Sequence, residues 1–92
     1  MANTSLKRIR TFIEMYDMEQ DVQVERLEHI HHGSQYCVIH KQFGPPWRTE
    51  YLCRTLGDTA HCVNSIIFDL PMENNLTRID TDKEGVETTT HT

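Results

Sequence analysis

The segment Gly44-Pro45-Pro46 constrains the fold more than any other part of the chain, because proline cannot continue a regular strand. Proline fixes its own φ and has no amide hydrogen to donate to a neighbouring strand. Gln35–Gln42, before the prolines, and Trp47–Leu56, after them, both have the residue pattern of strands, and the second has one apolar and one mostly charged face. The sequence therefore predicts two strands joined by a stiff loop.

Two further segments carry apolar residues at the spacing of a helix. The first is Ser5–Met18, for which Thr4 or Ser5 supplies the cap. The second is Thr59–Leu70, where Gly57-Asp58 ends the preceding strand and caps the helix. Each segment therefore predicts an amphipathic helix with one buried side.

The segment Asp21–His32 is ambiguous, because Val22 and Val24 alternate as in a strand while Leu27 and Ile30 fall out of that phase. We interpret it as a strand with a bulge, which ends at a turn beside Gly33.

The expected fold class is α+β, in the order helix, three-stranded antiparallel meander and helix, with both helices on the apolar face of the meander. A chain of 92 residues has room for one core. We place a single α+β domain at residues 1–78 and an acidic, Thr-rich, mobile tail at residues 79–92, with a short strand at Leu76–Ile79 as an alternative for the domain's end. The net charge is −5, and most of the acidity lies towards this C-terminal end.

Composition indicates a soluble protein of the cytoplasm, which would be the host cytoplasm if a phage encodes it. The N-terminus lacks the apolar run of a secretory signal, and the longest apolar stretch, Ser65–Phe68, is too short to cross a bilayer. Cys37, Cys53 and Cys62 are odd in number and lack C-x-x-C spacing, which favours a reducing compartment. The cysteines are best interpreted as small core residues.

The sequence contains no pattern that predicts catalysis, a cofactor or a small-molecule substrate. Four scattered glycines form no phosphate-binding loop. Cys37 with His40, or His61 with Cys62, could be proposed as a nucleophile and base, but adjacent side chains point apart and no oxyanion-forming motif accompanies them. We therefore expect a protein that is not an enzyme.

A histidine-rich stretch has the pattern H-x-H-H-x4-C-x2-H, formed by His29, His31, His32, Cys37 and His40. Two histidines on one face of a strand could bind zinc, but this spacing matches no structural zinc module. We expect no bound metal, with a zinc-binding or redox protein as a low-ranking alternative.

Basic residues in the first turns of the first helix, Lys7, Arg8 and Arg10, form one candidate binding surface. The helix macrodipole disfavours cations at this end, each by about 0.3 to 1 kcal/mol. They either bind an anionic partner or simply lie on a solvated helix end.

Lys41, Trp47 and Arg48, around the proline loop, form the second candidate surface. Trp and Arg are the residue types most enriched at binding hot spots, and a pre-organised loop loses little entropy on docking. Trp47 could equally be a core anchor of the third strand.

The predicted order over Ser5–Leu70 resembles that of double-stranded RNA-binding domains, which implies a small nucleic-acid-binding module as an alternative function. That family grips phosphates with a basic cluster at the start of its last helix. The matching stretch here is Asp58-Thr59-Ala60-His61, which is acidic and lacks Lys.

Across its whole length, from Ser5-Leu6-Lys7-Arg8-Ile9-Arg10 through Phe43-Gly44-Pro45-Pro46-Trp47, the chain looks like a phage-encoded anti-CRISPR protein. It is similar to those that act on the type I-F surveillance complex. The resemblance implies an inhibitor that docks on the subunits of a nucleoprotein complex, contacts guide RNA and blocks binding of target DNA. The group shares no motif, so the resemblance assigns no functional residue.

Overall fold

The structure is a computed structural model that describes residues 4–42, 44, 46–72 and 76–91. Two helices and five strands lie in these residues. In chain order they are α1 (Leu6–Met15), β1 (Val22–His31), β2 (Ser34–Lys41), β3 (Arg48–Cys53), α2 (Leu56–Ile67), β4 (Thr77–Thr81) and β5 (Glu87–His91). Neither described helix has the length and apolar character that crossing a membrane requires.

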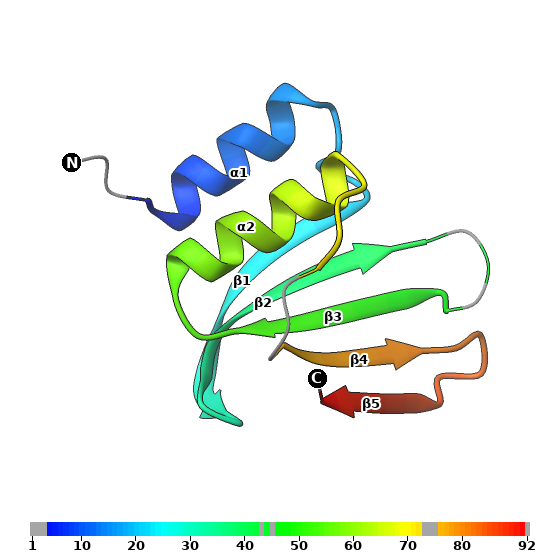
Figure 1. Cartoon of the computed structure of the whole chain (residues 1–92). Helices are drawn as coiled ribbons and strands as arrows, with labels where there is room; N and C mark the ends of the chain where they lie inside the picture. The colour runs from blue at the N-terminus through cyan, green and yellow to red at the C-terminus, as the bar shows by residue number, and fades with distance from the viewer. Residues whose placement is uncertain (1–3, 43, 45, 73–75, 92) are drawn as a thin grey trace.

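The five strands form one antiparallel sheet in the order β1-β2-β3-β4-β5. Both helices lie on the same face of this sheet, where α1 packs on β1 and α2 packs on β2 and β3. Strands β4 and β5 extend the sheet beyond the helices (Figure 1). We call the face opposite the helices the open face.

The predicted three-stranded meander is wrong, because two further strands follow α2 in the sheet: β4 overlaps the short strand considered at Leu76–Ile79, and β5 lies within the predicted acidic tail. Strand β4 pairs with β3, and the Thr49 hydroxyl donates to Asp80 Oδ1 at 2.7 Å. Asp82 closes the β4–β5 turn by accepting the amides of Glu84 and Val86 at 2.9 and 2.8 Å. The prediction failed because these strands are held by the backbone ladder and polar side chains, and supply few apolar residues.

Helix α1 begins as predicted, since the Ser5 Oγ accepts the Arg8 amide at 3.2 Å, but it ends at Met15. Helix α2 begins earlier than predicted. Thr55 is its N-cap, and its Oγ1 accepts the Asp58 amide at 3.0 Å. Gly57 and Asp58 therefore belong to the first turn, where a carboxylate interacts favourably with the helix dipole.

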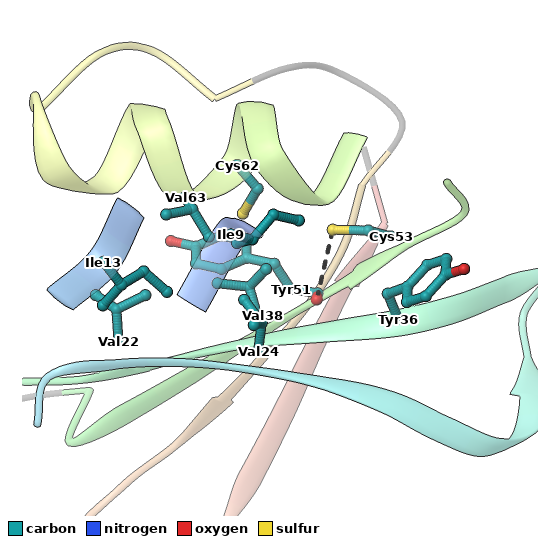
Figure 2. Packing of buried hydrophobic residues seen from close by; sticks show 10 residues of the cluster. All are labelled: Ile9, Ile13, Val22, Val24, Tyr36, Val38, Tyr51, Cys53, Cys62 and Val63. Carbon is teal, nitrogen blue, oxygen red and sulfur yellow. Dashed lines mark hydrogen bonds between the residues drawn. The ribbon is translucent and has the colours of Figure 1, made fainter. Parts of the chain in front are cut away.

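The main core lies between the helices and strands β1 to β3 (Figure 2). Ile9 and Ile13 of α1 and Val63 of α2 meet the buried side chains of the strands. The strands contribute Val22, Val24, Tyr36, Val38, Tyr51 and Cys53. The thiols of Cys37, Cys53 and Cys62 are buried, as expected of small core residues.

A second, smaller cluster of buried residues consists of Cys37, Ile39 and Leu52, with Leu27 and Ile79 packed against it. These side chains alternate with those of the main core along their strands, so the cluster lies on the open face. Leu27 falls out of phase with Val22 and Val24 for this reason: β1 carries apolar residues on both faces. The expected irregularity in β1 is present as a register shift between Arg26 and His31.

The β1–β2 hairpin turns through His32 and Gly33, whose φ values are +52° and +78°. Two successive positive φ angles are typical of the two-residue turn that suits the twist of a hairpin, and Gly33 adopts its angle without a steric cost. The hairpin tip reaches the far edge of the sheet, since the rings of His32 and His91 lie 5.1 Å apart. The sheet is therefore strongly curled around its open face.

Candidate functional site

Lys41, Trp47 and Arg48 lie at one end of the sheet, and we call them the tryptophan surface. Lys41 and Arg48 are cross-strand partners on β2 and β3, and both are exposed. Trp47 is 45% exposed, so it is not the core anchor that the alternative interpretation required. Phe43 and Pro45 of the predicted stiff loop lie outside the described residues.

The backbone of Trp47 is held on both sides, although its side chain is half exposed. Its carbonyl accepts the Gln42 amide at 2.9 Å, and its own amide donates to the Thr81 carbonyl at 3.0 Å. These bonds connect Trp47, the residue just before β3, to the chain after β2 and to the last residue of β4. A large aromatic side chain is therefore presented to solvent from a fixed position.

A polar network on the helix-bearing face supports this end of the sheet. The Gln42 amide donates to Thr49 Oγ1 at 2.9 Å, and the Thr49 hydroxyl donates to Asp80 at 2.7 Å. Arg78 Nε donates to both carboxylate oxygens of Asp80 at 3.0 Å. Thr49 is completely buried. The network thus ties β4 to β3 and to Gln42, directly after β2.

The charges of the tryptophan surface are mostly positive. Lys41 and Arg48 face each other across neighbouring strands on the open face, an arrangement of like charges that destabilises a sheet. Glu50 offsets part of this charge through an ion pair with Arg48 at 2.7 Å, and the Arg48 side chain is 46% exposed. An exposed pair of this kind adds little stability and leaves Arg48 open to an outside anion.

The three predicted helix cations do not act as one group. The Arg10 Nη2 donates to the Val24 carbonyl at 3.0 Å and so joins α1 to β1. Lys7 and Arg8 are exposed. The start of α1 and the tryptophan surface lie towards opposite ends of the molecule (Figure 1). The structure therefore does not bring the two predicted sets together.

The sequence did not predict a groove that runs between the two helices. It has a volume of about 450 Å³, and its lining is half apolar (Ile9, Phe12, Ala60 and Val63) and half polar (Thr4, Arg8, His61 and Asn64). An aromatic cluster of Phe12, Tyr16 and Phe68 lies along the same pair of helices, with ring centroids 5.1 to 6.3 Å apart. Tyr16 and Phe68 are each 45% exposed. The i, i+4 spacing of Phe12 and Tyr16 gave a signal, but it equally fits a core stripe.

Cys37 and His40 are poorly placed for nucleophilic chemistry. Burial, with smaller contributions from Glu50 and Glu25, raises the pKa of the Cys37 thiol to about 12, so the reactive thiolate is scarce at neutral pH. Cys37 and His40 lie on opposite faces of β2 by strand alternation. Within the described part of the chain, no three His, Cys, Asp or Glu side chains are grouped to hold a metal ion.

Comparison of the chain with known protein families, curated proteins and solved structures finds no match. The function must therefore be inferred from the residues of the chain itself.

Proposed function

We propose that this chain is a non-catalytic binding protein, and specifically a phage anti-CRISPR inhibitor that docks on subunits of a type I-F CRISPR surveillance complex and blocks binding of target DNA. The observation that carries the proposal is Trp47, half exposed on a backbone held on both sides and adjacent to two cations. A fixed aromatic side chain loses little conformational entropy on binding.

The chemistry of the tryptophan surface fits a nucleoprotein partner. Trp47 can fill an apolar pocket between protein subunits, because buried aromatic side chains dominate the binding energy of interfaces. Lys41 and Arg48 can pair with carboxylates of those subunits or with phosphates of a guide RNA, since Arg binds both kinds of oxygen pair. A partner that offers protein and RNA side by side would use all three residues.

A nucleic-acid-binding module is the second candidate function, because the order of α1, β1, β2, β3 and α2 is that of double-stranded RNA-binding domains. The site that grips phosphate in that family argues against it here. Asp58 lies in the first turn of α2, and its negative charge repels a phosphate at that helix end. Two strands also follow α2 in this chain.

The test is a pull-down against a purified type I-F surveillance complex, with circular dichroism to check that each variant is folded. Trp47→Ala and Arg48→Glu should reduce capture at least tenfold, because truncating a hot spot typically costs about 2 kcal/mol or more. Arg54→Glu is a matched control, since Arg54 is an exposed cation beyond the other end of β3. It should bind like the wild type.

Three outcomes separate the alternatives. If the wild-type protein does not bind the complex, the assignment as an inhibitor of this complex is wrong. If the wild type binds and both variants bind equally well, the partner uses another surface. If the protein instead shifts free duplex RNA with a steep dependence on salt, the nucleic-acid-binding module replaces the inhibitor.

A further inference from the structure

The two edges of the sheet differ in how well they are protected. An unprotected edge strand is a template for pairing with another chain. At the β1 edge, the Arg10 side chain of α1 donates a hydrogen bond to the Val24 carbonyl, and the register shift after Arg26 interrupts the regular pairing of β1. Glu25, Arg26 and Glu28 add charges along β1. Such features are the usual means by which proteins prevent pairing at an edge.

The β5 edge has fewer of these features over the described residues: Glu87 is a charged residue at its start, and the His32 ring of the β1–β2 hairpin lies 5.1 Å from the His91 ring at its end. Every residue of β5 is exposed, its register with β4 is unbroken, and it contains no proline or lysine. Thr88, Thr89 and Thr90 occupy its centre, and β-branched residues favour strands. Among the described residues, no strand lies beyond β5 in the sheet.

The hydrogen bond that closes the β4–β5 turn shows which backbone groups of β5 face outward. The Asp82 amide donates to the Val86 carbonyl at 3.0 Å and the Val86 amide donates to the Asp82 carboxylate, so these two residues stand at the position of a hydrogen-bonded pair at the end of the ladder. Such pairs alternate with non-hydrogen-bonded pairs along an antiparallel ladder. Asp80 with Thr88 and Arg78 with Thr90 are then hydrogen-bonded pairs. The amides and carbonyls of Glu87, Thr89 and His91 point away from β4, towards the free edge.

These outward residues are complementary to themselves. If a second β5 pairs antiparallel about Thr89, the two Thr89 residues face each other, and Glu87 faces His91 at both ends. Each of the three outward residues then lies in a hydrogen-bonded pair with a residue of the second copy. Their side chains share one face of the strand, so each Glu87 carboxylate meets an imidazole. Thr–Thr pairs are among the favourable cross-strand pairs, and an imidazole N–H can donate a hydrogen bond to a carboxylate.

We propose that two copies of this chain associate through β5, antiparallel and centred on Thr89, to form one continuous ten-stranded sheet. The contact is twofold symmetric and uses the same edge of both copies, so it closes at the dimer and does not propagate. The proposal is independent of the proposed function. It does bear on that function, because a dimer would present two tryptophan surfaces.

The central test compares Thr89→Pro with Thr89→Val in sedimentation equilibrium at increasing protein concentration. The wild type should shift from the monomer mass of 10.8 kDa to twice that value. Proline removes an outward amide that does not bond to β4, so the monomer should still fold. The dissociation constant of the dimer should rise by about tenfold or more. Valine keeps the amide and the β-branched shape, and should dimerise like the wild type.

A charge-swap experiment tests the register. Glu87→Lys places a lysine opposite His91 of the second copy and should weaken the dimer, whereas Glu87→Lys/His91→Glu should restore it. His91 also contacts Thr77, at 3.0 Å between Nδ1 and Oγ1, so circular dichroism must show that both variants are folded. In hydrogen exchange, the Thr89 amide should become protected as the protein concentration rises.

The proposal is overturned by a wild type that remains monomeric at all concentrations, as expected if β5 pairs with a different protein. It is equally overturned if folded Thr89→Pro dimerises as well as Thr89→Val, or if association continues beyond the dimer.

Discussion

Asp80 joins β4 to a buried hydroxyl of β3, and replacing it with alanine should strongly destabilise the protein. Its Oδ1 accepts the hydroxyl of Thr49 at 2.7 Å, and Thr49 is completely buried. Without Asp80, that hydroxyl keeps Gln42 as a donor but loses its own acceptor. Water cannot easily replace the acceptor at a buried site.

The magnitude follows from the environment of each contact. Losing a hydrogen bond from a buried hydroxyl to a charged acceptor costs about 1.5 to 3 kcal/mol. The Arg78 and Asp80 side chains are 43% and 22% exposed, so their ion pair adds at most about 1 kcal/mol. In a domain of this size, each kcal/mol lowers the melting temperature by about 4 to 8 °C. We expect the Asp80→Ala melting temperature to fall by about 10 °C or more.

Urea denaturation followed by circular dichroism gives the free energy of unfolding for Asp80→Ala, Thr49→Val and the double variant. The two changes should couple by about 0.5 to 3 kcal/mol, because each one removes the same hydrogen bond. Glu84→Ala is a suitable control, since Glu84 is an exposed acid in the β4–β5 turn. If Asp80→Ala changes stability by no more than Glu84→Ala, or if the Asp80 and Thr49 changes are additive, the hydrogen bond between Thr49 and Asp80 does not stabilise the protein as expected.

Two further predictions concern the end of the chain and the response to acid. Truncation after Arg78 removes β5 and most of β4, and should lower the melting temperature by more than Asp80→Ala does; an unchanged value would show that these strands contribute nothing to stability. Burial lowers the pKa of His40 below its usual 6.5, against a smaller opposing effect of Asp21. As the pH falls, His40 therefore binds a proton at a higher pH in the unfolded chain than in the folded protein, and the free energy of unfolding should decrease as the pH drops through 6.5. His40→Leu should flatten this pH dependence when urea denaturation is compared at pH 7.5 and 5.5.

The sequence predicted the elements that bury an apolar stripe and missed those that do not. Ile9 and Ile13 pointed to α1, and Tyr51 and Cys53 gave the correct inward phase of β3. Strand β5 has no apolar residue, so periodicity could not reveal it. Its turn did carry a local signal, because Asp82 followed three residues later by Gly85, at a φ of +84°, is typical of a turn.

The start of α2 was misplaced because two capping signals compete in one stretch. Gly57-Asp58 has the composition of a strand end followed by a cap, but Thr55 takes the cap position instead. Thr59 strengthens this choice, since its hydroxyl donates to the Thr55 carbonyl at 2.8 Å while its side chain is buried. Capping depends on where the chain leaves β3, and a single sequence does not reveal that position.

For the candidate site, the sequence identified exposed residues but not their arrangement. Arg10 has the same charge as Lys7 and Arg8 and lies close to them in α1, yet its side chain donates to the Val24 carbonyl of β1. Lys7 and Arg8 remain exposed at the start of α1, on the other side of the sheet from Arg48. The molecule measures 42 Å along its longest axis. A flat partner could therefore contact one cation set only, and a partner that engages both must enclose the protein, as a cleft between subunits of a large complex would.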